Sequence, residues 1–95
     1  MRGAVSVSFI DSFERDFSRL TPDIQKLAQD CIMDIQKDPM PGVRRPHSVT
    51  PRGKKPTVYT VDVTANKAYK MSFQMDGDTA ILRRVGTHKA IDRQA

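Results

Sequence analysis

Cysteine is almost absent from this sequence, and so are long apolar runs. Cys31 is the single cysteine in 95 residues, so one chain can form neither a disulfide framework nor a cysteine zinc site. No apolar run approaches the roughly 18 residues that a membrane-spanning helix needs, and residues 1–9 lack the apolar centre of a signal peptide. We therefore expect a cytoplasmic protein in which Cys31 is a buried, unreactive thiol.

Negative charge is also in short supply. The sequence has 16 Lys and Arg residues against 11 Asp and Glu, which gives a formal net charge of +5. Such a surface favours polyanionic partners: RNA, DNA, the ribosome or an acidic protein segment. A basic surface that is merely solvated remains the alternative. The length predicts one domain over residues 1–95, with a core that buries only about 60–65% of the unfolded surface.

Two periodicities organise the first forty residues. Valine or phenylalanine alternates with serine over residues 5–9, which predicts a half-buried strand. A short amphipathic stripe over residues 13–20 predicts a helix. A second helix begins at Thr21-Pro22, where a capping hydroxyl precedes a proline at the first helical position. This helix should end near Lys37, because the prolines that follow cannot continue it.

The second half of the chain has the pattern of a sheet. After an irregular, basic and proline-rich region over 38–56, three alternating segments predict strands at residues 59–63, 69–75 and 80–85. Asp76-Gly77 is a dipeptide that two-residue hairpin turns prefer, and a turn of helix can follow Thr87. The order β-α-α-β-β-β predicts an α+β fold, in which an N-terminal strand and a helical hairpin pack on a small antiparallel sheet.

The last predicted strand carries the residues with the clearest chemistry. Arg83 and Arg84 are fixed cations suited to phosphate, and His88 can exchange a proton near neutral pH. Strand alternation places the two arginines on opposite faces, Arg84 with Leu82 and Arg83 with Val85. RNA cleavage by the 2′-hydroxyl needs a base, an acid and cations around the phosphorane. It requires no metal, and no metal-binding cluster of Asp, Glu and His is visible, so no cofactor is predicted.

Three segments resemble the RelE/ParE superfamily of bacterial toxins. Residues 13–20 are similar to the opening helix of that family, and residues 69–78 to its third strand and hairpin. Residues 82–88, Leu-Arg-Arg-Val-Gly-Thr-His, resemble the Leu-x-Arg-x-Gly-Thr-His ending of the YafQ-like branch. The resemblance covers most of the chain and implies a type II toxin-antitoxin system toxin.

The resemblance implies a function but leaves an alternative open. RelE- and YafQ-like members are ribosome-dependent endoribonucleases that cut mRNA in the decoding site, and a cognate antitoxin inhibits each of them. ParE-like members share the fold but poison DNA gyrase, so the fold does not decide the function. The leading hypothesis is therefore an mRNA interferase. The alternative is a non-catalytic gyrase-targeting toxin or an inactive homologue.

The same resemblance implies a set of catalytic residues. His88 aligns with the histidine of the YafQ-like ending and would act as general acid or base, and Arg84 takes the place of an arginine associated with the scissile phosphate. His47 lies near a family histidine that precedes the second strand. Lys70 replaces a family arginine, which keeps the charge and loses the bidentate fork. A structural or surface role remains the alternative for each residue.

Further cations are expected to contact RNA or the ribosome. They comprise Arg44, Arg45, Arg52, Lys54, Lys55 and Arg83. Several of them lie in the irregular region 38–56, where a solvated basic loop is the alternative. Asp92 departs from the family pattern, because many members place an aromatic residue there to stack on an mRNA base. An aspartate cannot stack, but it could orient His88 from one helical turn away.

Overall fold

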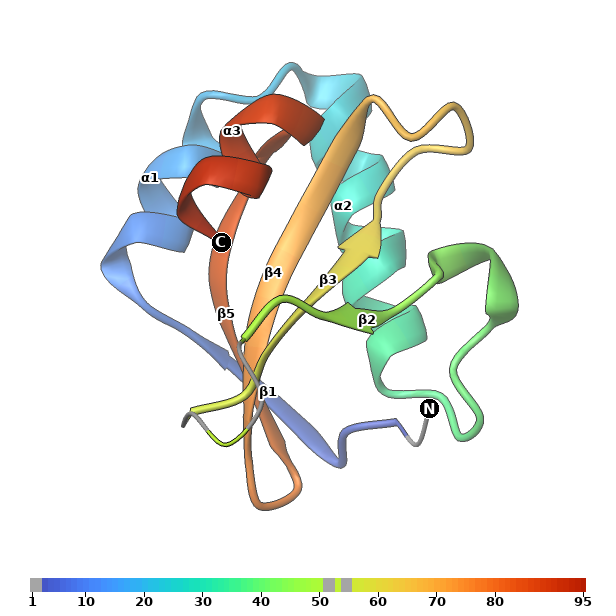
Figure 1. The fold of residues 1–95 in the computed structure, drawn as a ribbon. Helices are drawn as coiled ribbons and strands as arrows, with labels where there is room; N and C mark the ends of the chain where they lie inside the picture. The colour runs from blue at the N-terminus through green and yellow to red at the C-terminus, as the bar shows by residue number, and fades with distance from the viewer. Residues whose placement is uncertain (1–2, 51–52, 54–55) are drawn as a thin grey trace.

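The structure is a computed structural model that describes residues 3–50, 53 and 56–95 (Figure 1). The predicted RNA contacts Arg52, Lys54 and Lys55 therefore lie outside the described residues. The elements are β1 (Ser6–Phe9), α1 (Asp11–Ser18), α2 (Pro22–Ile35), the 3-10 helix η1 (Gly42–Arg44), β2 (His47–Ser48), β3 (Val58–Asp62), β4 (Tyr69–Asp76), β5 (Thr79–Thr87) and α3 (His88–Gln94).

The strands form one five-stranded sheet in the order β1-β5-β4-β3-β2. Strands β3 to β5 pair antiparallel, as predicted, and β2, which the sequence did not predict, pairs antiparallel with β3. The N-terminal strand β1 joins this sheet at its edge and runs parallel to β5. A parallel pair needs a long connection between its strands, and here all the intervening elements supply it. The α+β class is confirmed, with a mixed sheet.

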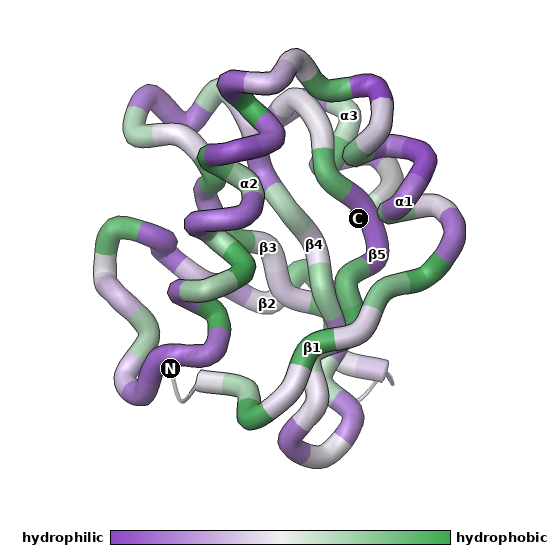
Figure 2. The backbone as a smooth tube through the Cα atoms, turned by 180° about the vertical axis from the view of Figure 1, so that it is seen from behind, coloured by the Kyte–Doolittle hydropathy of each residue, from purple (hydrophilic) through white to green (hydrophobic). Residues whose placement is uncertain are grey.

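Helices cover the two faces of the sheet unequally. Helices α1 and α2 lie on one face, and α3 lies on the other (Figure 1). Figure 2 shows α1 and α2 in front of the sheet from the opposite side. The core forms between these helices and the sheet, where Phe73, Met71 and Ile35 are fully buried with Cys31. The face toward α3 therefore has room for polar side chains.

The capping residues predicted from the sequence mark the start of α2 correctly. Thr21 caps α2 by accepting a hydrogen bond from the Ile24 backbone at 3.5 Å, with Pro22 in the first turn. The first strand is less buried than its alternation predicts, because β1 is an edge strand. Val5 is 69% and Phe9 56% exposed. In the described part of the chain, no helix has the length and apolarity that a membrane crossing requires.

Within the region 38–56 that the sequence predicts to be irregular, residues 38–50 hold more regular structure than expected. It contains η1 and the two-residue strand β2, which is too short to leave a periodic pattern. The hairpin turn between β4 and β5 is also displaced by one residue. Asp76 pairs with Thr79, so the turn is Gly77-Asp78, with Gly77 at a φ of 60°. A positive φ there suits glycine.

A bulge in β5 overturns the predicted alternation of its arginines. Leu82 pairs with Phe73 and Arg84 pairs with Ser72, so Arg83 is an extra residue in the strand. Leu82 and Val85 consequently face the same core, at 1% and 3% exposure. An inserted residue reverses the phase of every later side chain, which a strict period of two cannot anticipate.

Candidate active site

A small cavity of about 110 Å³ opens on the α3 side of the sheet. The residues that line it are Arg45, His47, Asp62, Lys67, Lys70 and His88. Three of the four predicted catalytic residues, His47, Lys70 and His88, thus lie around one space. Arg45, one of the predicted RNA contacts, lies beside them. The tertiary structure gathers these side chains from β2, β3, β4 and the start of α3.

Strand register explains why these residues meet. Lys70 pairs across the sheet with Asp62, and His47 pairs with Thr60. Because neighbours in register share a face, and Asp62 and Thr60 are two residues apart, all four side chains emerge on the same face. The residues next to them in the chain, such as Val61 and Met71, point into the core on the opposite face.

His88 is held at the first position of α3. Its backbone N–H donates to the Ala68 carbonyl at 2.9 Å, and Thr87 caps the helix by accepting from the Ala90 N–H at 3.3 Å. The imidazole Nε2 lies 2.8 Å from Asp92 Oδ2, so the predicted orientation by Asp92 is confirmed. A carboxylate only accepts, so Nε2 carries the hydrogen and the lone pair of the neutral ring is on Nδ1.

His47 is oriented by two neighbours. Its Nδ1 lies 3.3 Å from the Arg45 carbonyl oxygen, and its Nε2 lies 3.1 Å from Thr60 Oγ1. A carbonyl oxygen cannot donate, so Nδ1 is the donor and Nε2 of the neutral ring accepts from the threonine hydroxyl. Both ring nitrogens of His47 thus have protein partners, whereas the partner of the His88 ring is at Nε2.

The charge around the cavity is positive on balance. Lys70 and Asp62 are only 7% and 6% exposed, and Arg45 Nε lies 4.0 Å from Asp62 Oδ2. With Lys67, three basic side chains thus share the cavity with one carboxylate. Buried charges need partners, and the surplus of cations suits an anion with more than one oxygen.

Asp62 and Lys67 are the lining residues that the sequence reasoning missed. Asp62 is the acidic one of the two. It lies between Val61 and Val63 in a segment that the alternation assigned to a strand, so its presence on the polar face could have been read from the sequence. Its neighbourhood could not, because the pairing with Lys70 depends on the register of β3 and β4. No single-strand pattern contains that register.

Arg84 does not line this cavity. Its Nε donates to Asp16 Oδ2 at 2.7 Å and its Nη2 to Asp16 Oδ1 at 3.1 Å. Donation of these hydrogen bonds to the Asp16 carboxylate raises the pKa of the Arg84 guanidinium. The residue lines a separate hollow with Asp16 and Tyr69, between α1 and the start of α3. The structure thus gives this arginine a structural partner.

Two predicted RNA contacts also have protein partners. Arg44 Nε donates to Asp34 Oδ2 at 2.8 Å, and its Nη1 donates to the carbonyls of Asp62 and Val63. Arg83 Nη1 donates to Gln74 Oε1 at 2.6 Å, while its Nε is buried with no hydrogen-bond partner among the described residues. Arg44 therefore anchors η1, and Arg83 lies on the sheet outside the cavity.

Across residues 3–50, 53 and 56–95, no three His, Cys, Asp or Glu side chains are grouped so that they could hold a metal ion. The cavity instead offers two oriented imidazoles, two lysines and an arginine. Such a set can move protons and stabilise negative charge on oxygen.

No family model matches the sequence, and no curated protein matches it either. Solved structures match in fold. A copper-bound mutant toxin from Helicobacter pylori has a TM-score of 0.69 at 19% identity, over 90% of this chain and 97% of the other. YafQ from E. coli strain BL21(DE3) has a TM-score of 0.64 at 14% identity, over 96% and 98%.

An archaeal complex matches as well. A chain of the RelB–RelE antitoxin–toxin complex from Methanococcus jannaschii has a TM-score of 0.61 at 22% identity, over 93% of this chain and 99% of the other. The fold is therefore that of RelE- and YafQ-like toxins, as the resemblance in sequence predicted.

Proposed function

We propose that this chain, with its RelE- and YafQ-like toxin fold, is the toxin of a type II toxin-antitoxin system and cleaves mRNA on the ribosome. One observation carries the proposal: His47, Lys70 and His88 line one cavity with a surplus of cations. That combination supplies a base, an acid and charge stabilisation for a phosphodiester. The reaction it fits is attack by the ribose 2′-hydroxyl.

The roles follow from the fixed ring nitrogens. His88, held by Asp92 at Nε2, has a lone pair on Nδ1 and takes the proton of the 2′-hydroxyl. The 2′-oxygen then bonds to phosphorus as the bond from phosphorus to the 5′-oxygen breaks. Protonated His47 gives its proton to that leaving oxygen. The products are a 2′,3′-cyclic phosphate and a free 5′-hydroxyl.

The cations act on the charge that develops at phosphorus. Lys70 is held almost out of solvent, where a fixed charge stabilises a phosphorane better than it would in water. Arg45 is 59% exposed in its side chain and only loosely paired with Asp62, so it can reach a phosphate oxygen. Arg84 remains a predicted phosphate contact, but it would first have to leave Asp16.

The partners of the proposed toxin follow from its fold and charge. The complex from Methanococcus jannaschii pairs a toxin with its antitoxin, and a net charge of +5 suits an acidic antitoxin segment. The ribosome would position the mRNA, because the cavity is too small to hold more than a phosphate and its immediate surroundings. A ribosomal target implies action in the cytoplasm.

The test is cleavage of mRNA on ribosomes, read by primer extension after expression of the protein. The parent should give discrete cuts, and His88→Gln or His47→Gln should reduce them at least a hundredfold, as general acid–base catalysis contributes about that much or more. Lys89→Gln, one residue from His88 and exposed, is the matched control. Unchanged cutting by both histidine variants would refute the proposal.

The gyrase-targeting alternative has its own outcome in the same experiment. Toxicity without RNA cuts, unaffected by His88→Gln, together with loss of DNA supercoiling by gyrase, would identify a non-catalytic toxin. The feature that favours this alternative is Asp92, which stands where many members of the family have an aromatic residue.

A further inference from the structure

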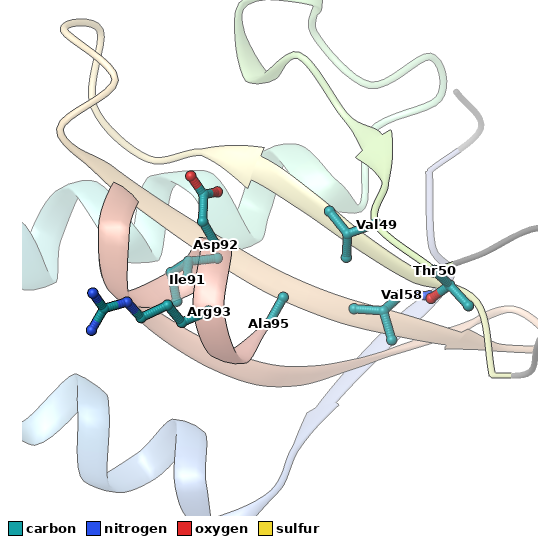
Figure 3. A pocket seen from close by; sticks show the side chains of 7 residues that line it. All are labelled: Val49, Thr50, Val58, Ile91, Asp92, Arg93 and Ala95. Atoms are coloured by element: carbon teal, nitrogen blue, oxygen red, sulfur yellow. The ribbon is translucent and has the colours of Figure 1, made fainter.

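A larger pocket lies directly beside the cavity of the proposed active site. It measures about 460 Å³, which is within the range of small-molecule sites. Figure 3 shows its lining, with Ile91, Asp92 and Ala95 of the α3 segment on one side and Val49 and Val58 on the other. Thr50 and Arg93 complete the lining, so four aliphatic side chains share the walls with one hydroxyl, one carboxylate and one guanidinium. The Arg93 guanidinium points away from Val49 and Val58 (Figure 3).

The two hollows share both of their walls. His47 lines the small cavity and Val49, two residues later, lines the large pocket. On the other wall His88 lines the small cavity, and Asp92, one helical turn later, lines the large pocket. One turn of helix advances about 5.4 Å and two residues of extended chain about 7 Å. A single nucleotide can thus place its phosphate in one hollow and its base in the other.

Asp92 is the acidic group that such a base would meet. Its Oδ2 lies 2.8 Å from His88 Nε2. No hydrogen bond or ion pair joins its Oδ1 to any of the described residues. Its side chain is 54% exposed, so the free oxygen is open to a ligand. An ionised carboxylate only accepts hydrogen bonds. It therefore favours a base with an exocyclic amino group, as aspartate does toward cytosine N4.

We propose that this pocket binds a nucleobase of the cleaved RNA and that Asp92 selects a base carrying an exocyclic amino group. The inference rests on the proposed function, because it identifies the occupant of the pocket as part of the same substrate. Aliphatic walls accept the ring faces, and the carboxylate reads one edge. Asp92 would then serve two purposes, orienting His88 through one oxygen and reading the base through the other.

The experiment compares two nucleotides that differ in one group of the pyrimidine ring. Cytidine 3′-monophosphate offers an N4 amino donor where uridine 3′-monophosphate has the O4 acceptor. Dissociation constants of both for the full-length protein can be measured from backbone amide shifts in NMR titrations. The cytidine nucleotide should bind about tenfold more tightly, the effect of one hydrogen bond to a charged group. Shifts should concentrate at Val49, Ile91 and Asp92.

A single substitution should invert the preference. In Asp92→Asn the side-chain carbonyl can still accept from His88 Nε2, while the amide now donates to the base. Uridine 3′-monophosphate should then bind more tightly than the cytidine nucleotide. Asp30→Asn, on an exposed position of α2, is the control and should leave the ratio unchanged. Because Asp92 is half exposed, the substitution should not disturb folding.

The outcomes separate this inference from the nuclease proposal. Equal binding of the two nucleotides, or an unchanged ratio in Asp92→Asn, would overturn the base pocket and leave mRNA cleavage untouched. A preference that inverts in the variant would support the pocket even if primer extension gave no cuts, since binding is measured without cleavage.

Discussion

Asp16 and Arg84 join α1 to the end of β5 through both oxygens of the carboxylate. Arg84 donates through Nε at 2.7 Å and through Nη2 at 3.1 Å, and the backbone N–H of Val85 donates to the same Oδ2 at 3.2 Å. β1 pairs with β5 only as far as Leu82. Asp16 thus satisfies a backbone donor on the part of β5 that β1 does not reach.

Removal of Asp16 should destabilise the protein. Asp16→Ala leaves the guanidinium and the Val85 N–H without their acceptor, which should lower the free energy of unfolding by about 1–3 kcal/mol. Asp30→Ala, also within a helix but exposed, should change it by less than about 0.5 kcal/mol. Urea unfolding followed by circular dichroism measures both. Equal urea midpoints for the two variants would show that the Asp16–Arg84 pair does not stabilise the fold.

Asp34 predicts a pH dependence of stability. Its carboxylate receives Lys37 Nζ and Arg44 Nε, each at 2.8 Å, and the hydrogen bond from Lys37, helped by Arg44, lowers the pKa of Asp34 below its ordinary 3.8. The unfolded chain therefore binds this proton more readily. The stabilisation is complete above about pH 5 and is lost as the pH falls through the lowered pKa.

The Asp34→Asn variant isolates this contribution. At pH 7 the variant should unfold at a lower urea concentration than the parent, because it lacks the charge that holds Lys37 and Arg44. As the pH falls below 3.8 and through the lowered pKa of Asp34, the two midpoints should converge. A difference that stayed constant over this interval would mean that the ion pairs of Asp34 do not account for the dependence.

Cys31 should be inert in the folded protein. Burial raises the pKa of its thiol to about 12, and the side chain is fully enclosed in the core. The reactive thiolate is therefore scarce near neutral pH, and reagents cannot reach the sulfur. Ellman's reagent at pH 8 should give no colour with the native protein and one equivalent of thiol in 6 M guanidinium. Rapid reaction of the native protein would contradict the burial.

Lys70 should matter for cleavage more than any exposed lysine. Lys70→Gln removes the buried charge beside the proposed phosphate site and should reduce cutting of ribosome-bound mRNA about a hundredfold, comparable to loss of one oxyanion-stabilising group. Lys26→Gln on the exposed side of α2 should leave cutting within a factor of two or so. Full activity of the Lys70 variant, at unchanged stability, would remove Lys70 from the mechanism.

Local features of this fold could be read from the sequence. Thr21-Pro22 marked the start of α2, and the glycine of the β4–β5 turn marked the hairpin, although one residue away from its observed place. The relation of His88 to Asp92 was also predictable, because residues four apart on a helix share a face. In each case the interacting groups are close in the chain.

Long-range partners could not be read in the same way. The bulge at Arg83 reversed the expected facing of β5, and the carboxylate that occupies Arg84 is 68 positions away in the chain. Asp62 entered the cavity through its register with Lys70. Alternation assigns residues to faces but says nothing about which strand lies opposite.

The amino-acid order by itself determined the helical and alternating segments, the caps that bound them and the basic character of the chain, because these depend on near neighbours and on composition. Tertiary structure alone decided that β1 runs parallel to β5, that two imidazoles and a lysine surround one cavity, and that Arg84 is held elsewhere by Asp16. Those outcomes depend on strand order, register and packing between distant segments, which no local pattern encodes.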